Sequence, residues 1–160
     1  IDPGTAITGF GALNQEGNRL RSIDYGVIRT TPDLSGSQRL KIIYQQVTDL
    51  IKRFSPQEIA VERLFFSKNT RTAFDVGEAR GVILLAAAMQ GVEIMEYTPL
   101  QVKMAVVGYG RADKRQVQEM VRVLLGLKVI PKPDDAADAL AMAICHAHCR
   151  RNGLLKDVKR

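Results

Sequence analysis

Hydrophobic and polar residues alternate at the start of the chain, which is the pattern of half-buried strands. Residues 8–14 and 20–28 are rich in β-prone side chains and flank a polar turn around Gly17, and this predicts a hairpin. The pair Ile1-Asp2 is expected to be the end of a further strand whose start precedes the sequence given. The opening of the chain therefore predicts a three-stranded antiparallel meander.

Helical spacing of apolar residues begins after residue 37 and continues to about residue 53. The elements after it are predicted as strand, helix, strand and three helices: 58–65, 70–90, 92–97, a helix opened by Thr98-Pro99, 114–125 and 134–149. Three antiparallel strands followed by this alternation predict an α/β fold, with a mixed five-stranded sheet and helices on both faces.

Composition fits one compact domain. The chain has 160 residues, of which 46% are hydrophobic and 25% are charged, and these values exclude a disordered protein and a disulfide scaffold. The apolar run 81–89 is too short to cross a bilayer. Cys145 and Cys149 indicate reduced thiols. We therefore expect a cytoplasmic protein without a membrane segment.

Positive charge points to a polyanionic partner. The 23 Lys and Arg residues exceed the 17 Asp and Glu residues, giving a net charge of +6. Nucleic acid is the first candidate, although many basic proteins bind none. We expect one domain over residues 1–150 and a basic tail over 151–160, which lacks the apolar spacing of a packed helix.

Acidic residues stand where the predicted sheet and the last helix would bring them together. Asp2 ends the first strand, and Glu62 is the one acid inside the otherwise apolar part of a central strand. Asp135 and Asp138 are three residues apart and share one face of the last helix. Asp134 is interpreted as a helix-entry residue or N-cap. Hereafter "the four acids" are Asp2, Glu62, Asp135 and Asp138.

Clustered carboxylates repel one another unless cations neutralise them, and oxygen ligands favour Mg²⁺ or Mn²⁺ over zinc. Two such ions can activate a water and stabilise the leaving oxygen of a phosphodiester. Taken singly, Asp2 also fits a turn, and Asp135 and Asp138 also fit the first turn of any helix. Glu62 is harder to explain without a partner, because an acid inside a buried strand is seldom unpaired, and taken together the four acids favour a metal site.

Five blocks in the same order carry a family resemblance: IDPGTAITGFG at 1–11, AVERLFFSKN at 60–69, ARG at 79–81, QVKMAVVGYGRADKRQVQ at 101–118 and DDAADALAMAI at 134–144. Together they resemble the RuvC family of bacterial Holliday junction resolvases. The resemblance implies a ribonuclease H-like fold and a Mg²⁺-dependent crossover junction endodeoxyribonuclease that nicks four-way junctions symmetrically in recombination and repair. It also implies that the four acids are the catalytic metal ligands.

The same resemblance assigns the residues that face DNA. Phe65 would stack on or wedge between bases, with Phe66 in the core, and Lys114 would stabilise charge at the phosphate or the attacking water. Lys103 matches a family lysine near the active site. Other basic residues are expected along the DNA path, although they also fit solvated helix faces: Lys68, Arg71, Arg80, Arg111 and Arg115.

A junction has two strands to cut, so a symmetric dimer suits the task. Ala73, Gly77 and Gly81 lie four residues apart on the helix over 70–90 and permit close helix approach, against the chain's own sheet or against a second copy. The family resemblance favours a homodimer through this helix. It also implies that the branch-migration proteins RuvA and RuvB are partners.

Two alternatives and one false signal accompany this interpretation. The alternatives are a ribonuclease H-like nuclease acting on another nucleic acid and a nonenzymatic junction-binding module, while an actin-like ATPase would need a second domain. Cys145, His146, His148 and Cys149 suggest zinc, but on one helix they spread too widely to surround an ion. We interpret them as ordinary packing residues.

Overall fold

The computed structural model describes residues 1–63 and 70–151, apart from the side chains of residues 70–72 and 151. Its elements, in chain order, are β1 (Ile7–Glu16), β2 (Arg19–Arg29), α1 (Gly36–Phe54), β3 (Glu58–Glu62), α2 (Thr70–Met89), β4 (Glu93–Tyr97), α3 (Pro99–Val107), α4 (Lys114–Leu124) and α5 (Asp134–Arg151). The predicted alternation of strands and helices is confirmed.

The strands form two hydrogen-bonded ladders. β1 and β2 are an antiparallel hairpin whose register shifts between Ala12 and Leu13. β3 and β4 are parallel, and their last residues, Glu62 and Tyr97, are register partners. Parallel strands need a crossover connection, and here α2 provides it.

The opening residues join the two ladders. Asp2 and Gly9 exchange two backbone hydrogen bonds of 2.9 Å, and the Ile1 nitrogen donates to the Ala60 carbonyl at 2.6 Å. This segment lies between β1 and β3 but makes a single bridge and no strand. Among the described residues the predicted five-stranded sheet is therefore two two-stranded ladders linked by Ile1-Asp2.

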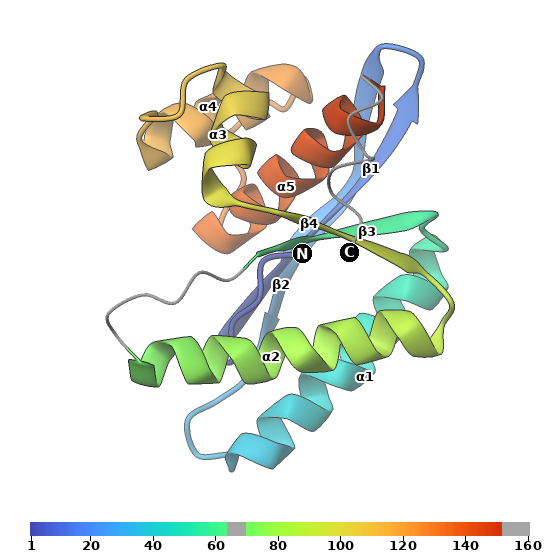
Figure 1. The fold of residues 1–160 in the computed structure, drawn as a ribbon, viewed down its shortest axis with the longest axis vertical. Helices are drawn as coiled ribbons and strands as arrows, with labels where there is room; N and C mark the ends of the chain where they lie inside the picture. Colours follow the sequence, from blue (N-terminus) through green and yellow to red (C-terminus); the bar gives the residue numbers. More distant parts are fainter. Residues whose placement is uncertain (64–69, 152–160) are drawn as a thin grey trace.

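Helices cover both faces of these strands, as predicted (Figure 1). α1 and α2 lie on one face and bury Ile43, Val47 and Ile83 against it. α3, α4 and α5 lie on the other face, where Tyr97 and Leu140 are among the buried residues. Strands covered on both faces are typical of an α/β domain.

Local signals in the sequence account for several helix ends. Thr98 caps α3, with Pro99 at its first position, as the sequence predicts. Gly126 follows α4 in the left-handed conformation, at φ 63°. The N-cap interpretation of Asp134 is wrong, because α5 begins at Asp134 itself and the carboxylate accepts a hydrogen bond from Lys132 at 2.9 Å.

None of the helices within the described residues has the length and apolarity that a membrane crossing requires.

Candidate active site

Two of the four acids are fixed by the strands. Asp2 is held through its backbone bridge to Gly9, and Glu62 is the final residue of β3. The Ile1 bond to Ala60 brings the opening segment alongside β3, so both carboxylates reach the same edge. Both side chains are only partly exposed.

The other two acids arrive on the first turns of α5, and glycines in β1 let this helix come close. A Cβ at Gly9 would lie 2.0 Å from the carbonyl oxygen of Asp135, and one at Gly11 would lie 2.7 Å from Leu140 Cδ2. Gly9 therefore touches both Asp2, by its bridge, and Asp135. A glycine inside a strand is a usual sign of such close approach, so Gly9 and Gly11 are the signal in the sequence that indicates where α5 packs.

The acidic side chains lie close enough for their charges to interact. The pKa of Asp2 is raised to about 7, mainly by burial and in part by the neighbouring charges of Glu62, Asp138 and Asp135. Burial and the charge of Asp138 likewise raise the pKa of Glu62. Burial raises the pKa of Asp138 even though an ion pair with Lys114 opposes the shift. Asp2 therefore lies within electrostatic reach of each of the other three acids.

Lys114 reaches this acidic group from the start of α4. Its Nζ lies 3.0 Å from Asp138 Oδ2 and 3.6 Å from Asp134 Oδ2. The hydrogen bond to Asp138 is the main reason that the pKa of Lys114 is raised. Asp113 caps α4 and fixes the position of its first turn. The predicted lysine therefore lies beside the acids, with half of its side chain exposed.

The carboxylate oxygens of the four acids are the kind of ligand that a hard divalent cation such as Mg²⁺ prefers. Carboxylates that raise one another's pKa gain from added positive charge, and Lys114 supplies one charge to one of them. Within residues 1–63 and 70–151, however, no three His, Cys, Asp or Glu side chains converge closely enough to hold an ion. An ion at this edge must therefore draw its ligands together from the sheet and from α5.

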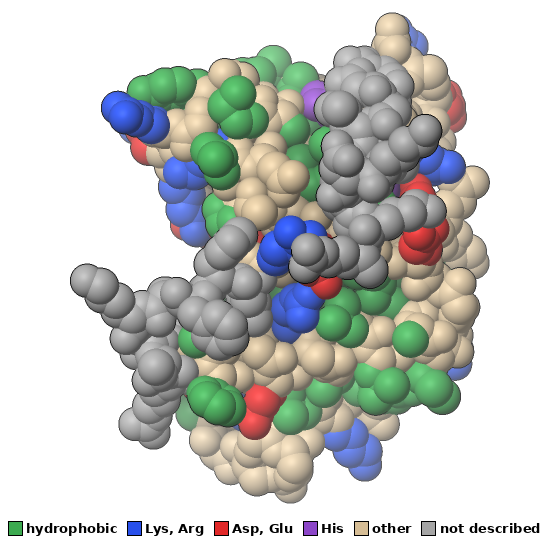
Figure 2. Space-filling view, in the orientation of Figure 1, with side chains coloured by type: hydrophobic (Ala, Val, Ile, Leu, Met, Phe, Trp, Pro, Cys, Tyr) green, Lys and Arg blue, Asp and Glu red, His purple; other side chains and the backbone are tan. Residues whose placement is uncertain are grey.

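A second charged group stands next to Glu62. Glu96 of β4 pairs with Arg80 of α2 and lies 3.5 Å from the Nε of Arg63. Arg80 also donates to the Glu62 carbonyl at 3.3 Å. Figure 2 shows basic side chains beside acidic ones near the centre of this face. The expectation that Arg80 lines a DNA path is therefore not supported, because its largely buried guanidinium ties α2 to the strand ends.

The predicted DNA-facing residues fall into three groups. Phe65 and Lys68 lie outside the described residues, and Arg71 lies in the first turn of α2 with an undescribed side chain. Lys103 is half-buried in α3. Arg111 and Arg115 are exposed, and they lie close to Lys114 in the sequence.

The histidines of α5 have ordinary partners. His146 contacts Tyr97 and Glu58, and the Nδ1 of His148 lies 3.0 Å from the Ala105 carbonyl oxygen. Cys145 is fully buried. His146 and His148 therefore have partners within the chain, and no group of three His, Cys, Asp or Glu side chains that could hold a metal ion occurs in the described part of the chain.

Residues 1–146 match the family described as crossover junction endodeoxyribonuclease RuvC. The chain belongs to the RuvC family. A RuvC from Desulfitobacterium hafniense is 60% identical over 148 residues, which are 92% of this chain and 90% of that protein. A RuvC from Rubrobacter xylanophilus is 59% identical over 151 residues, or 94% of this chain and 84% of that protein.

Solved structures agree with this membership. RuvC of Thermus thermophilus, in complex with a Holliday junction substrate, superposes with a TM-score of 0.91 at 40% identity, over 96% of this chain and 93% of that one. A yeast mitochondrial Holliday junction resolvase shares the fold with a TM-score of 0.65 at 15% identity, covering 98% and 83% of the two chains. The ribonuclease H-like fold of the RuvC family is thereby confirmed, and the RuvC family is a family of metal-dependent nucleases.

Proposed function

We propose that this chain resolves four-way DNA junctions by paired symmetric nicks, in homologous recombination and DNA repair. One observation carries the proposal: acids from the sheet and from α5 lie close enough that the charges of Glu62, Asp135 and Asp138 raise the pKa of Asp2. The chain that bears them matches a junction-bound RuvC along nearly its whole length. Endonucleolytic hydrolysis of a phosphodiester is the chemistry that such an acidic edge in a basic protein supports.

The four acids are the proposed metal ligands, with two Mg²⁺ ions per site and Mn²⁺ as a substitute. Asp2 and Glu62 would hold the ions from the sheet side, and Asp135 and Asp138 from α5. When bound, the ions supply an activated water and stabilise the leaving oxygen. The protein contributes a partly buried edge where carboxylates already lie close to one another, so the ions replace unfavourable repulsion by attraction.

Lys114 is proposed to act at the scissile phosphate. Its ammonium group lies 3.0 Å from Asp138 and is half-exposed, so it can contact an incoming phosphate oxygen without leaving the site. The neighbouring basic residues Arg111 and Arg115 are proposed to hold the phosphate backbone. The remaining proposed DNA contacts are Phe65, Lys68, Arg71 and Lys103.

A homodimer through α2 is proposed from the surface of that helix. Phe74 and Leu85 are 76% and 54% exposed, and a side chain at Gly81 would meet only open space. Ala73 and Gly77 are half-buried beside them. An outward apolar face around a glycine allows a second helix to approach closely, and an isologous pair would present two sites to two strands.

The wider setting of the protein is proposed as follows. Residues 1–150 form the nuclease domain, and residues 151–160, nearly all outside the described part, form a basic tail. The branch-migration proteins RuvA and RuvB are proposed as partners that deliver the junction. The protein would act in the cytoplasm, where bacterial chromosomal DNA is found.

The first experiment incubates the protein with a synthetic mobile four-way junction and with linear duplex of the same sequence, with and without Mg²⁺. Symmetric, ligatable nicks in the junction alone, and only with metal, are expected. Equal cutting of an RNA–DNA hybrid would instead favour another ribonuclease H-like substrate. Junction binding without cutting in Mg²⁺ and in Mn²⁺ would favour a nonenzymatic binding module.

Asp135→Asn tests whether the acids do chemistry. The amide removes one charge and leaves the shape nearly unchanged, so we expect the junction to bind while the cutting rate falls about 100-fold or more. Asp49→Asn, at an exposed position of α1 away from the acids, is the matched control and should cut at the normal rate. An unchanged rate for Asp135→Asn at saturating Mg²⁺ would rule out the proposed metal site.

A further inference from the structure

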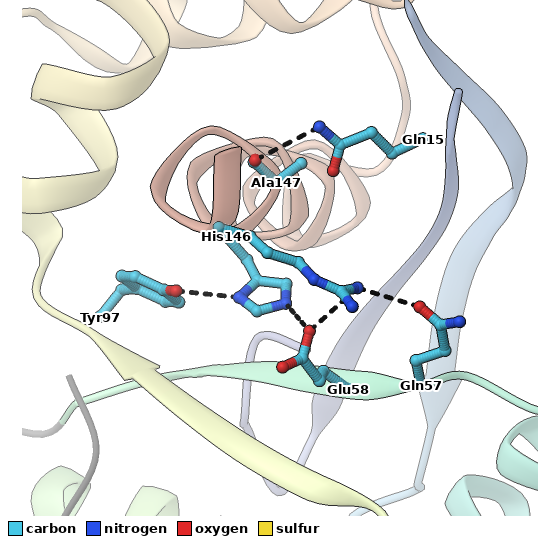
Figure 3. Close-up of polar contacts among 7 residues, drawn as sticks. Gln15, Gln57, Glu58, Tyr97, His146 and Ala147 are labelled. Atoms are coloured by element: carbon cyan, nitrogen blue, oxygen red, sulfur yellow. Dashed lines mark hydrogen bonds and ion pairs between the residues drawn. The ribbon is translucent and has the colours of Figure 1, made fainter. Parts of the chain in front are cut away.

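A largely buried chain of polar contacts joins α5 to the sheet (Figure 3), and it runs from Tyr97, the register partner of Glu62, to Glu58 at the start of β3. Tyr97 Oη lies 2.9 Å from His146 Nδ1, and His146 Nε2 lies 3.1 Å from Glu58 Oε2. We call these three residues the polar clamp. They come from the last residue of β4, the fourth turn of α5 and the first residue of β3.

The arrangement of protons in the polar clamp follows from the chemistry of its groups when the imidazole is neutral. An ionised Glu58 carboxylate can only accept, so Nε2–H donates to it, and Nδ1 then accepts from the Tyr97 hydroxyl. Arg150 completes the set, since one of its guanidinium nitrogens lies 3.2 Å from Glu58 Oε2 and also donates to Gln57 at 2.9 Å. Burial lowers the pKa of His146, which favours this neutral form.

The polar clamp and the acids lie on the same side of α5. Asp135 and His146 are eleven residues apart, close to three whole helical turns, so both face the sheet about 16 Å from each other along the axis. β3 spans about 13 Å from Glu58 to Glu62. The helix and the strand therefore meet twice, once at the acids and once at the polar clamp.

Apolar packing and directional bonds contribute differently to the position of α5. Gly9 and Gly11 let the helix approach β1 closely, with the Leu140 side chain packed against Gly11. Near its other end the helix borders a cavity of about 710 Å³, lined in part by Ala143, Ala147 and Phe54. Hydrophobic contact is not directional, whereas the bonds of the polar clamp are.

We propose that the polar clamp consists of positioning residues for the cutting reaction. It holds α5 in register, and so keeps Asp135 and Asp138 aligned with the acids of the sheet. This inference rests on the proposed function, because alignment matters only if the four acids act together. Misplacement of a reacting group by about 1 Å can reduce a rate about 100-fold.

Tyr97→Phe and His146→Gln are the test variants. Phe removes only the hydroxyl, and Gln can keep a donor near Glu58 while losing the contact to Tyr97. Ile144→Val is the matched control, because Ile144 is fully buried on α5 and its shortening removes no polar contact. Each variant is measured for single-turnover cutting rate, junction affinity without divalent metal, Mn²⁺ affinity by electron paramagnetic resonance, and melting temperature.

We expect both clamp variants to cut about 10-fold or more slowly and to bind Mn²⁺ more weakly, with junction affinity unchanged within about twofold. The Ile144→Val control should melt earlier yet cut at the normal rate. Normal cutting and Mn²⁺ affinity in both clamp variants would overturn the proposal. The proposal would also be overturned if Ile144→Val lost as much cutting rate for each degree of lost melting temperature as the two clamp variants do.

Rescue by a conservative change provides a second, independent check. Glu58→Gln keeps an acceptor for the imidazole and should retain most of the rate, whereas Glu58→Leu should lose as much as His146→Gln. Equal rates for the two Glu58 variants would overturn the proposal. If the unmodified protein cuts no junction at all, the proposed function fails, and the Mn²⁺ affinities of the same variants still report whether the polar clamp aligns the acids.

Discussion

Gly9 is the residue on which the meeting of the sheet and the last helix depends most directly. It bridges Asp2 through its backbone and lies against the carbonyl of Asp135. A side chain there has no flexible neighbour to displace, because the nearest atoms are backbone. The absence of a side chain at this position therefore sets the distance between two predicted metal ligands.

Gly9→Ala should consequently damage both stability and activity. The added methyl group must push α5 away from β1, so we expect the free energy of unfolding to fall by about 1–3 kcal/mol and cutting to fall at least about 10-fold. Urea unfolding and the junction assay measure the two effects. Gly36→Ala, where a Cβ meets nothing within 4 Å, is the control and should leave both nearly unchanged.

Lys114 is a second single residue whose replacement can be tested. Its loss should lower the cutting rate while leaving the free energy of unfolding nearly unchanged. The pair with Asp138 is largely exposed, so Lys114→Gln should change the free energy of unfolding by less than about 1 kcal/mol. We expect the cutting rate to fall about 10-fold to 100-fold, because a positive charge near the phosphate is lost. Lys41→Gln, on the exposed side of α1, controls for the loss of one charge from the whole protein. A normal rate for Lys114→Gln would show that the lysine only anchors α4.

At the scale of elements, α5 organises the molecule, because it carries two acids at one end and His146 near the other. Its existence could be predicted from the Ala-rich pattern over 134–149, and the four acids could be predicted from their places in strands and helix. The partners of His146 could not be predicted, since Glu58 is distant in sequence and looks like an ordinary strand-entry residue. Arg80 likewise looked free for DNA until the fold brought Glu96 beside it.

The buried His146 predicts how stability depends on pH. Its pKa is lowered from 6.5 by burial, against the opposing charge of Glu58, with Arg150 adding to the lowering. As the pH falls through 6.5, the unfolded chain takes up a proton at His146 before the folded chain does, so the free energy of unfolding decreases. The decrease stops once the pH is below the pKa of His146 in the folded chain, because both states are then protonated.

The measurement is urea unfolding at pH 7.5 and pH 5.5 for the unmodified protein and for His146→Gln. The comparison isolates one group, because Asp2, with its raised pKa, contributes a slope of the opposite sign in both proteins. We expect the unmodified protein to lose more stability on acidification than the variant. Identical losses in both would contradict the buried neutral state of His146.

At the scale of the whole molecule, the outward face of α2 exposes apolar side chains, among them Phe74 and Leu85. Leu85→Glu places a charge in the middle of that face and should convert the proposed dimer into monomers, which sedimentation velocity measures. Junction nicks should then become unpaired, since each monomer carries one site. Val129→Glu, at another apolar residue that is 67% exposed, is the control and should remain dimeric.

The layered arrangement was predictable from the order of strands and helices, while the break into two ladders was not. Ile1-Asp2 reads as a strand because apolar and acidic residues precede a turn, yet it pairs with β1 through a single bridge. Pairing is decided by which backbone groups meet in three dimensions, and no local pattern contains that information.

The separation of the four acids along the sequence, two within its first 62 residues and two in α5, has a consequence for synthesis. Asp2 and Glu62 leave the ribosome early, but Asp135 and Asp138 follow only with α5, which then has to dock on the glycines of β1. A nascent chain, or a fragment that lacks this last helix, holds only half of the ligands. On the proposed function, the ability to cut DNA therefore appears only when folding is complete, and unfinished copies leave the chromosome intact.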